Sequence, residues 1–171
     1  MARSTTTTRS VTFPRGFRAA GATCGIKQSG QPDLTLIVAD EPCVAAGVFT
    51  TNRLPGAPVI VGRRHLRRGL LRAIVCNSGN ANASTGSEGE RNARRMCELV
   101  AQHVGCDARQ VLPSSTGIIG VQLPMDKLRR GIETAALRTA SGAAADADAA
   151  RGIMTTDLVP KSAKRTVRIG D

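Results

Sequence analysis

The order of the apolar patterns along the chain is the feature that most limits how it can fold. Residues 33–39 place Leu34, Leu36 and Val38 at alternate positions, on one face, and this pattern predicts a strand. Residues 19–30 read as a glycine-punctuated hairpin region, and further strands are predicted at 43–50, 58–61, 70–77 and 110–112. Helical patterns come mostly later. Strands grouped early and helices packed later predict an α+β fold, a layered sandwich of mixed sheet and helices.

Two later segments predict helices with defined ends. The first begins near Ser87, which forms a capping box with Glu90, and it ends at Gly105. Its apolar positions recur at helical spacing and form one stripe: Ala93, Met96, Cys97, Val100 and Val104. The second helix is opened by Pro124 and buries Leu128 and Ile132. A third helix through 149–154 and a final strand at 164–169 complete the prediction.

Length and composition indicate one globular domain. The chain has 171 residues, of which 41% are hydrophobic, enough for a sizeable core. We expect a disordered tail at 1–10 and a domain at 11–171. No apolar run approaches the ~18–20 residues that span a bilayer, so no membrane association is expected. The five cysteines include no C-x-x-C pair, which argues against a disulfide framework or a zinc site and favours a reducing, cytoplasmic setting.

The formal net charge of +11 raises the alternative of a nucleic-acid-binding module. Its densest part is the cluster of five arginines between Arg63 and Arg72. The chain has no Trp and no Tyr, so it offers few rings on which bases could stack. A solvated basic surface is the preferred interpretation, and no nucleic-acid partner is expected.

The segment that follows the predicted strand at 110–112 is the strongest candidate for chemistry. Pro113 is expected to break the strand, and Thr116 and Gly117 then lie in a tight turn rich in hydroxyl side chains. Such a turn can aim backbone N–H groups and a hydroxyl at one point, as an oxyanion hole requires; an ordinary loop is the alternative. The segment supplies no activated nucleophile, and the chain contains no G-x-S-x-G, Walker A or H-E-x-x-H motif.

Several short motifs, taken in their order along the chain, resemble the N-terminal half of the ornithine acetyltransferase family. They lie at residues 16–21, 46–52, 57–59, 77–83, 115–120, 123–125 and 153–157. This family is also called glutamate N-acetyltransferase or ArgJ, and the resemblance extends from about Val11 to Ile169. It implies the ArgJ-like (DmpA/ArgJ-like) α+β fold of that N-terminal part.

The resemblance also implies a reaction. Enzymes of this family move an acetyl group from N-acetylornithine to glutamate, and some also accept acetyl-CoA as donor; no cofactor or metal is expected. Thr116 and Gly117 match the oxyanion hole of the family. Thr155 and Thr156 fall in the motif that contacts substrate, with Thr155 preferred; from the residues alone, a helix or turn cap is the favoured interpretation of Thr155.

Family precursors cut themselves into an α and a β chain, and the N-terminal Thr of β is the nucleophile, since its own amine can act as base. This chain ends at Asp171, before the positions where that cleavage site would fall. The resemblance therefore implies a C-terminally incomplete α portion that is inactive without a β partner and assembles with it as an α2β2 heterotetramer. A relic that binds an acyl amino acid without turning it over is the remaining alternative.

Overall fold

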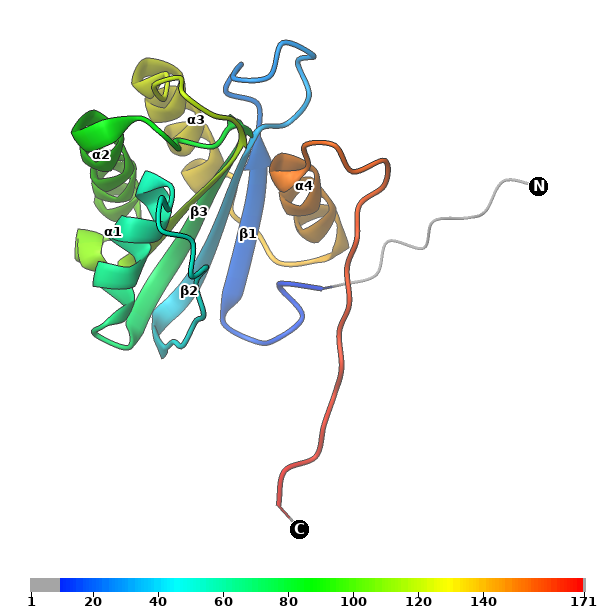
Figure 1. Cartoon of the computed structure of the whole chain (residues 1–171). Coiled ribbons are helices and arrows are strands. Elements are labelled where there is room, and N and C mark those ends of the chain that lie inside the picture. Colours follow the sequence, from blue (N-terminus) through cyan, green and yellow to red (C-terminus); the bar gives the residue numbers. More distant parts are fainter. Residues whose placement is uncertain (1–9, 171) are drawn as a thin grey trace.

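A four-stranded sheet with helices on both faces forms the body of the computed structural model, which describes residues 10–170 (Figure 1). The strands are β1 (Phe17–Ala22), β2 (Leu34–Val44), β3 (Leu70–Asn80) and β4 (Val111–Ile118), and they lie in that order across the sheet. β1, β2 and β3 are antiparallel neighbours, whereas β4 runs parallel to β3. The predicted α+β class with a mixed sheet is confirmed.

Four α-helices pack on this sheet: α1 (Ala57–Leu66), α2 (Gly86–Val104), α3 (Met125–Leu137) and α4 (Ala143–Ile153). In Figure 1, α1, α2 and α3 lie on one side of the sheet and α4 lies on the other. The core fills the space between the sheet and the first three helices. Its largest fully buried side chains include Leu34, Leu36, Val75, Met96, Val100, Leu128 and Ile132.

The helix predicted from 87 to 105 is present as α2, with the expected stripe buried and Gly105 ending it in the left-handed conformation (φ 72°). The predicted capping box at Ser87 is wrong. The helix starts one residue earlier, after Thr85, and no side chain caps its first turn. The Thr85 hydroxyl instead donates to Asn82 Oδ1 at 2.8 Å, which ties the helix start to the preceding loop.

The strand predicted at 58–61 is wrong, because these residues begin helix α1. Pro58 lies in the first turn, where its missing N–H costs nothing. Ala57, Val61 and His65 are buried at helical spacing. Arginines lie between and after these positions, so the helical spacing of the buried residues is not evident in the sequence. A run of four apolar residues alone does not distinguish a strand from a helix.

The separate strand predicted at 43–50, beyond Glu41 and Pro42, is also wrong. β2 continues through both residues to Val44, with a register shift between Val38 and Cys43, and residues 45–50 are irregular. The prediction that Pro113 ends a strand fails for a related reason. β4 lies at the edge of the sheet, where a proline removes no required ladder hydrogen bond, so the strand runs on to Ile118.

The strand predicted at 164–169 is wrong as well. These residues are irregular and exposed, and in Figure 1 the segment extends away from the sheet, where it has no strand to pair with. Lys164 Nζ lies 4.3 Å from the centre of the Phe13 ring. Of the predicted N-terminal tail, residues 1–9 lie outside the described residues.

Helix α4 approaches its face of the sheet very closely. The Thr35 hydroxyl donates to the Ala149 carbonyl at 2.6 Å, and the Ser78 hydroxyl donates to the Gly152 carbonyl at 2.7 Å. A methyl group at Gly152 would lie 2.4 Å from the Leu34 carbonyl oxygen, so only glycine allows this approach. α4 makes its sheet contacts mainly with β1 and β2, and this leaves much of β3 and β4 open on that face.

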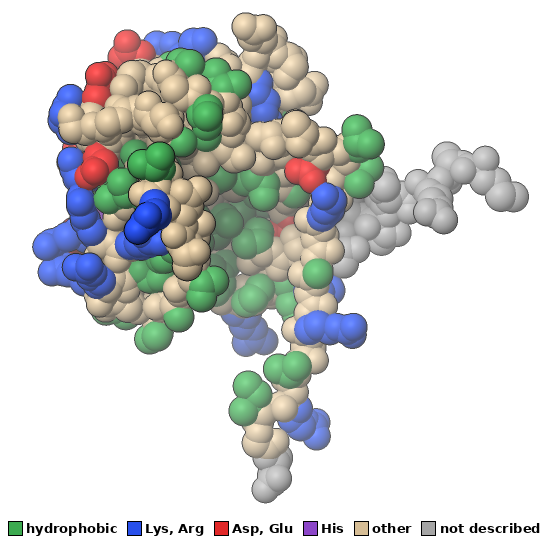
Figure 2. Space-filling view, in the orientation of Figure 1, with side chains coloured by type: hydrophobic (Ala, Val, Ile, Leu, Met, Phe, Trp, Pro, Cys, Tyr) green, Lys and Arg blue, Asp and Glu red, His purple; other side chains and the backbone are tan. Residues whose placement is uncertain are grey.

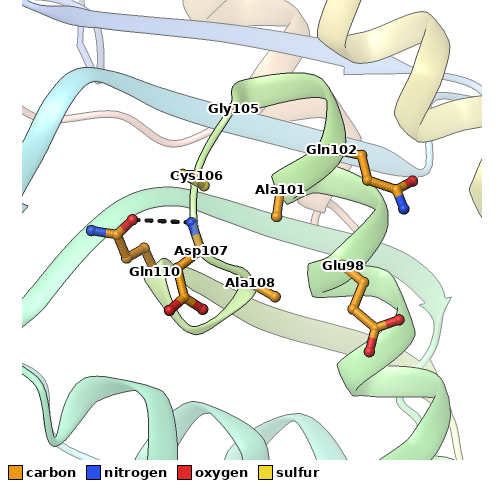
Figure 3. A pocket seen from close by; sticks show the side chains of 8 residues that line it. All are labelled: Glu98, Ala101, Gln102, Gly105, Cys106, Asp107, Ala108 and Gln110. Carbon is orange, nitrogen blue, oxygen red and sulfur yellow. Dashed lines mark hydrogen bonds between the residues drawn. The ribbon is translucent and has the colours of Figure 1, made fainter.

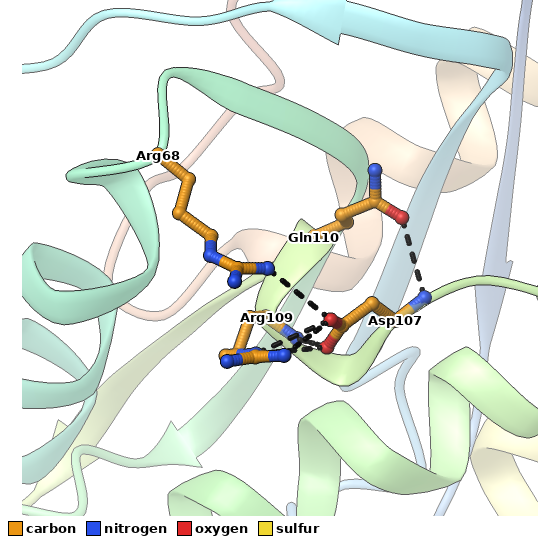
Figure 4. A network of polar contacts seen from close by, with 4 residues as sticks. All are labelled: Arg68, Asp107, Arg109 and Gln110. Carbon is orange, nitrogen blue, oxygen red and sulfur yellow. Dashed lines mark hydrogen bonds and ion pairs between the residues drawn. The ribbon is translucent and has the colours of Figure 1, made fainter.

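A short 3₁₀ turn (Ala108–Gln110) leads into β4 and is held by a polar network around Asp107 (Figure 4). The Asp107 carboxylate accepts from the Arg109 backbone N–H at 2.9 Å and forms ion pairs with Arg109 (2.8 Å) and Arg68 (3.3 Å). The Arg109 hydrogen bonds and charge, with a smaller charge effect of Arg68, lower the pKa of Asp107 to about 2.

We expect Asp107→Asn to reduce stability only where the wild-type carboxylate is ionised. Because the folded-state pKa is depressed, the stabilisation is fully present above the ordinary value of 3.8 and is lost as the pH falls toward 2. Urea midpoints of wild type and variant should therefore differ at neutral pH and converge near pH 2. Glu133→Gln, at an exposed carboxylate of α3, is the control; a difference that persists at pH 2 would contradict the electrostatic origin.

Candidate functional site

Thr116 and Gly117 lie at the end of β4, beside the end of β3. Thr116 pairs with Ser78, and Gly117 pairs with Gly79. Because the two strands are parallel, their carboxyl ends meet at the same edge of the sheet, the usual place for a site in parallel sheets. The structure therefore brings the candidate oxyanion segment against the polar segment 77–80, which continues β3 beyond the strand predicted at 70–77.

Glycines make the contact between these two strand ends. Gly117 has φ +138°, and a methyl group there would lie 2.3 Å from the Gly79 carbonyl carbon and 2.4 Å from the Asn80 nitrogen. Gly79 has φ +96°, and a methyl group on it would lie 3.1 Å from both Ile26 Cγ2 and Lys27 Cγ. β3 and β4 thus meet backbone to backbone at Gly79 and Gly117, and the side chains of Ile26 and Lys27 lie against Gly79.

Buried asparagines fix this corner. Asn77 Nδ2 donates to the Asn80 carbonyl at 2.8 Å, and Asn77 Oδ1 accepts from the Ser115 hydroxyl at 2.5 Å. Asn80 Nδ2 donates to the carbonyls of Val121 (3.1 Å) and Gln122 (3.2 Å). Buried amides with their partners satisfied make a rigid polar network. The residues were visible in the sequence as a polar interruption of a strand pattern, but their pairing was not.

The side chain of Thr116 belongs to the face of the sheet that carries α4. Side chains alternate along a strand, and the register places Cys76 opposite Ser114 and Ser78 opposite Thr116. Since Ser78 reaches the Gly152 carbonyl of α4, all four lie on that face. Thr116 is half-buried and Gly117 is exposed, so this corner is open to a small molecule.

Thr155 and Thr156 lie in the exposed segment that follows α4. Thr155, but not Thr156, lines a pocket of about 330 Å³. The other residues of this pocket come from the loop before β2, from the last turn of α4 and from the segment after it: Lys27, Ser29, Gln31, Pro32, Arg151, Met154, Asp157 and Pro160. Thr116 is not among them. Met154 is the C-cap residue of α4, and its backbone N–H donates to the Arg151 carbonyl at 3.2 Å.

Lys27 links the pocket to the glycine corner, since its side chain passes over Gly79 and also lines the pocket. Its loop is held by the buried carboxylate of Asp33, which accepts from the backbone N–H groups of Cys24 (2.5 Å), Ile26 (2.6 Å) and Lys27 (3.0 Å). Burial lowers the pKa of Lys27, while the charge of Asp33 and then Cys76 oppose that effect.

The thiols near the corner are not activated nucleophiles. Burial raises the pKa of Cys76, and burial together with the charge of Asp33 raises that of Cys24 to about 12, so both are neutral thiols at pH 7. The His65 ring is buried on α1, with Nδ1 2.8 Å from the Val111 carbonyl oxygen, at the other end of β4. The corner offers hydrogen-bond donors and a cation, and its thiols supply no nucleophile.

The larger hollow of about 770 Å³ lies at the far end of α2 (Figure 3). It is lined by residues on both sides of Gly105, from Glu98 to Gln110. Gln110 directly precedes β4, so this hollow is at the opposite end of that strand from Thr116. It belongs to the turn that Asp107 organises and not to the candidate site.

The arginine cluster at 63–72 forms part of a basic surface over α1 and α2 (Figure 2). Two of its cations are in ion pairs: Arg64 with Glu90 at 2.9 Å, and Arg68 with Asp107 at 3.3 Å. These pairs fit the preferred interpretation of a solvated face.

Within residues 10–170, no group of three or more His, Cys, Asp or Glu side chains could hold a metal ion, and no helix has the length and apolar character to cross a bilayer.

The comparisons with known proteins agree with one another. The model of the ArgJ family matches residues 18–171. The arginine biosynthesis bifunctional protein ArgJ of Rhodopirellula baltica is 46% identical over 162 residues, which cover 95% of this chain and 40% of that protein. The protein of the same name from Nitratidesulfovibrio vulgaris is 50% identical over 157 residues, covering 91% and 39%. The chain thus spans about two fifths of the length of these relatives.

Solved structures show the same fold. The ornithine acetyltransferase of Mycobacterium tuberculosis, solved in complex with ornithine, superposes with a TM-score of 0.86 at 43% identity, over 88% of this chain and 81% of that chain. The arginine biosynthesis bifunctional protein ArgJ of Bacillus halodurans superposes with a TM-score of 0.84 at 35% identity, over 88% and 78%.

Proposed function

The chain belongs to the ArgJ family, and we propose that it is the N-terminal portion of an acetyltransferase that moves the acetyl group of N-acetylornithine to glutamate in arginine biosynthesis. The observation that carries the proposal is the contact of Gly117 with Gly79 and Asn80 at the joint end of β3 and β4. It fixes a short stretch of backbone, next to the Thr116 hydroxyl, on an open edge of the sheet.

In this proposal Thr116 and Gly117 form the oxyanion hole. Attack on the acetyl carbonyl places negative charge on its oxygen, and donors that are already fixed stabilise that charge without reorganising. The asparagine network around Asn77 and Asn80 supplies the rigidity, and Thr155 contacts the substrate from the neighbouring pocket. The acetyl donor in the first half of the reaction is N-acetylornithine, with acetyl-CoA as an alternative donor.

The nucleophile and the rest of the site come from a β portion, either of the same precursor or a separate β-like protein, assembled with this chain as α2β2. Two observations support this partner. The relatives are about two and a half times as long as this chain. The open face of β2 and β3 holds an apolar hollow of about 170 Å³ beside exposed Val44, a surface that a partner would cover. We also place the assembly in the cytoplasm, where the five free thiols stay reduced.

Co-production tests the proposal. We expect this chain alone to transfer no acetyl group from N-acetylornithine to glutamate. We expect activity when it is produced with a C-terminal portion of the Mycobacterium tuberculosis relative that is cut to begin with the Thr that the family resemblance implies as nucleophile. Product formation is followed by mass spectrometry. The control is the same C-terminal portion with that Thr replaced by Ala. A soluble, co-purifying pair without activity would contradict the proposal.

A further inference from the structure

Lys27 lies where the loop before β2, the end of β3 and the segment after α4 come together. Its Cγ is 3.1 Å from the position of a methyl group on Gly79, the residue that Gly117 contacts. Its side chain also lines the pocket that contains Thr155. Lys27 is therefore the residue that joins the two predicted site segments, although neither the motifs nor the family resemblance had singled it out.

The Lys27 ammonium is on the same face of the sheet as Thr116. The charge of Lys27 lowers the pKa of the Cys76 thiol, against the larger effect of burial, and Cys76 in turn acts on Lys27. Lys27 also lines the pocket together with Arg151 and Met154, at the end of α4, which places it on the face of the sheet that carries α4. Cys76 shares its face of the sheet with Ser114, which lies two residues before Thr116 on β4. The Lys27 side chain thus lies against Gly79, the residue that Gly117 contacts, on the face of the sheet that carries Thr116.

Of the charged side chains that line the pocket, Lys27 is the cation most available to bind an anion, because Arg151 and Asp157 are already in ion pairs. Its Nζ donates to the Pro32 carbonyl at 2.7 Å, which leaves two N–H donors, and among the described residues it takes part in none of the ion pairs. Arg151 is paired with Asp148 at 2.7 Å, and Asp157 is paired with Lys161. The loop that carries Lys27 is fixed by Asp33, so the ammonium is held in place before any ligand arrives.

We propose that Lys27 binds the α-carboxylate of the amino-acid substrate and so orients its α-nitrogen toward the Thr116–Gly117 corner. This inference rests on the proposed function and deepens it. N-acetylornithine and glutamate share one feature beside the nitrogen that loses or gains the acetyl group, namely the α-carboxylate. A single fixed cation can therefore orient both substrates in turn, while their different side chains extend elsewhere.

The test uses the co-produced pair, with glutamate and 4-aminobutyrate as alternative acceptors. 4-Aminobutyrate is glutamate without the α-carboxylate. We expect Lys27→Gln to raise the KM for glutamate by about 10- to 100-fold, as loss of a charged hydrogen bond does, and to leave the slow rate with 4-aminobutyrate unchanged. Lys27→Arg, which keeps the charge, should restore most of the affinity for glutamate.

The matched control is Lys127→Gln. Lys127 Nζ also donates to a carbonyl of this loop, that of Gly25 at 2.6 Å, but it does not line the pocket, so its KM should stay at the wild-type value. Equal losses with both acceptors on Lys27→Gln would show a structural role and overturn the inference, as would an unchanged KM for glutamate.

A second measurement separates this inference from the proposed function. If the wild-type pair transfers no acetyl group, the proposed function fails, and binding of glutamate to the 171-residue chain decides the inference alone. NMR titration should then show glutamate binding by wild type that weakens at least about tenfold in Lys27→Gln. No binding by wild type, or equal binding by the variant, would overturn it.

Discussion

Replacing Gly117 with alanine is expected to lower the free energy of unfolding by about 3 kcal/mol or more, because two costs combine. The residue has φ +138°, which disfavours any side chain, and the new methyl group would lie 2.3 Å from the Gly79 carbonyl carbon. Relieving that overlap requires β3 and β4 to separate at the corner. For a chain of this size the melting temperature should fall by roughly 10 °C, which circular dichroism would measure.

Gly120→Ala is the matched control for this substitution. Gly120 also has a positive φ, +78°, but a methyl group there would meet no atom within 4 Å. Only the conformational cost remains, about 1 kcal/mol. If both variants lose the same stability, the backbone contact between Gly117 and Gly79 is not present in solution.

Replacing Thr116 with alanine is expected to lower the kcat of the co-produced pair by about 10²-fold or more, as removal of one oxyanion-hole donor does. The KM for glutamate should change little, because the lost interaction forms only as charge develops on the acetyl oxygen. Steady-state kinetics of acetyl transfer would separate the two parameters. Thr116→Ser keeps the hydroxyl and should retain most of the rate.

The control for a general loss of a threonine is Thr134→Ala. The Thr134 hydroxyl donates to the Arg130 carbonyl within α3 at 2.9 Å, on the other side of the sheet from the corner. Its kcat should equal that of wild type. An unchanged kcat in Thr116→Ala would remove the Thr116 hydroxyl from the mechanism and leave the backbone of Gly117 as the remaining donor.

The elements predicted correctly are those whose pattern is local and long. β2 and β3 show their period over many residues, and the α2 stripe from Ala93 to Val104 lies between a polar start and the stop at Gly105. α1 was missed because arginines interrupt its stripe. The ends of β4 and of the chain were misjudged because strand formation there depends on which strand is the neighbour: β3 is beside Pro113, and no strand pairs with residues 164–169.

The candidate site shows the same division. Thr116, Gly117 and Thr155 could be selected from the order of short motifs, because each motif is contiguous. The asparagine network, the contact of Gly117 with Gly79 and the position of Lys27 could not, because each joins residues that are remote in the sequence. The sequence contains these residues, but only the register of β4 on β3 brings them together.

That register has a consequence for how the site comes into being. The antiparallel neighbours β1, β2 and β3 follow one another along the chain, but the pairing of β4 with β3 must enclose the loop at 81–85 and the whole of α2. Closing such a loop costs entropy that only the packed helix can offset. The corner therefore does not exist as a local structure in the unfolded chain. It is a property of the completed tertiary fold, so partly folded chains carry the motifs without the arrangement that gives them a function.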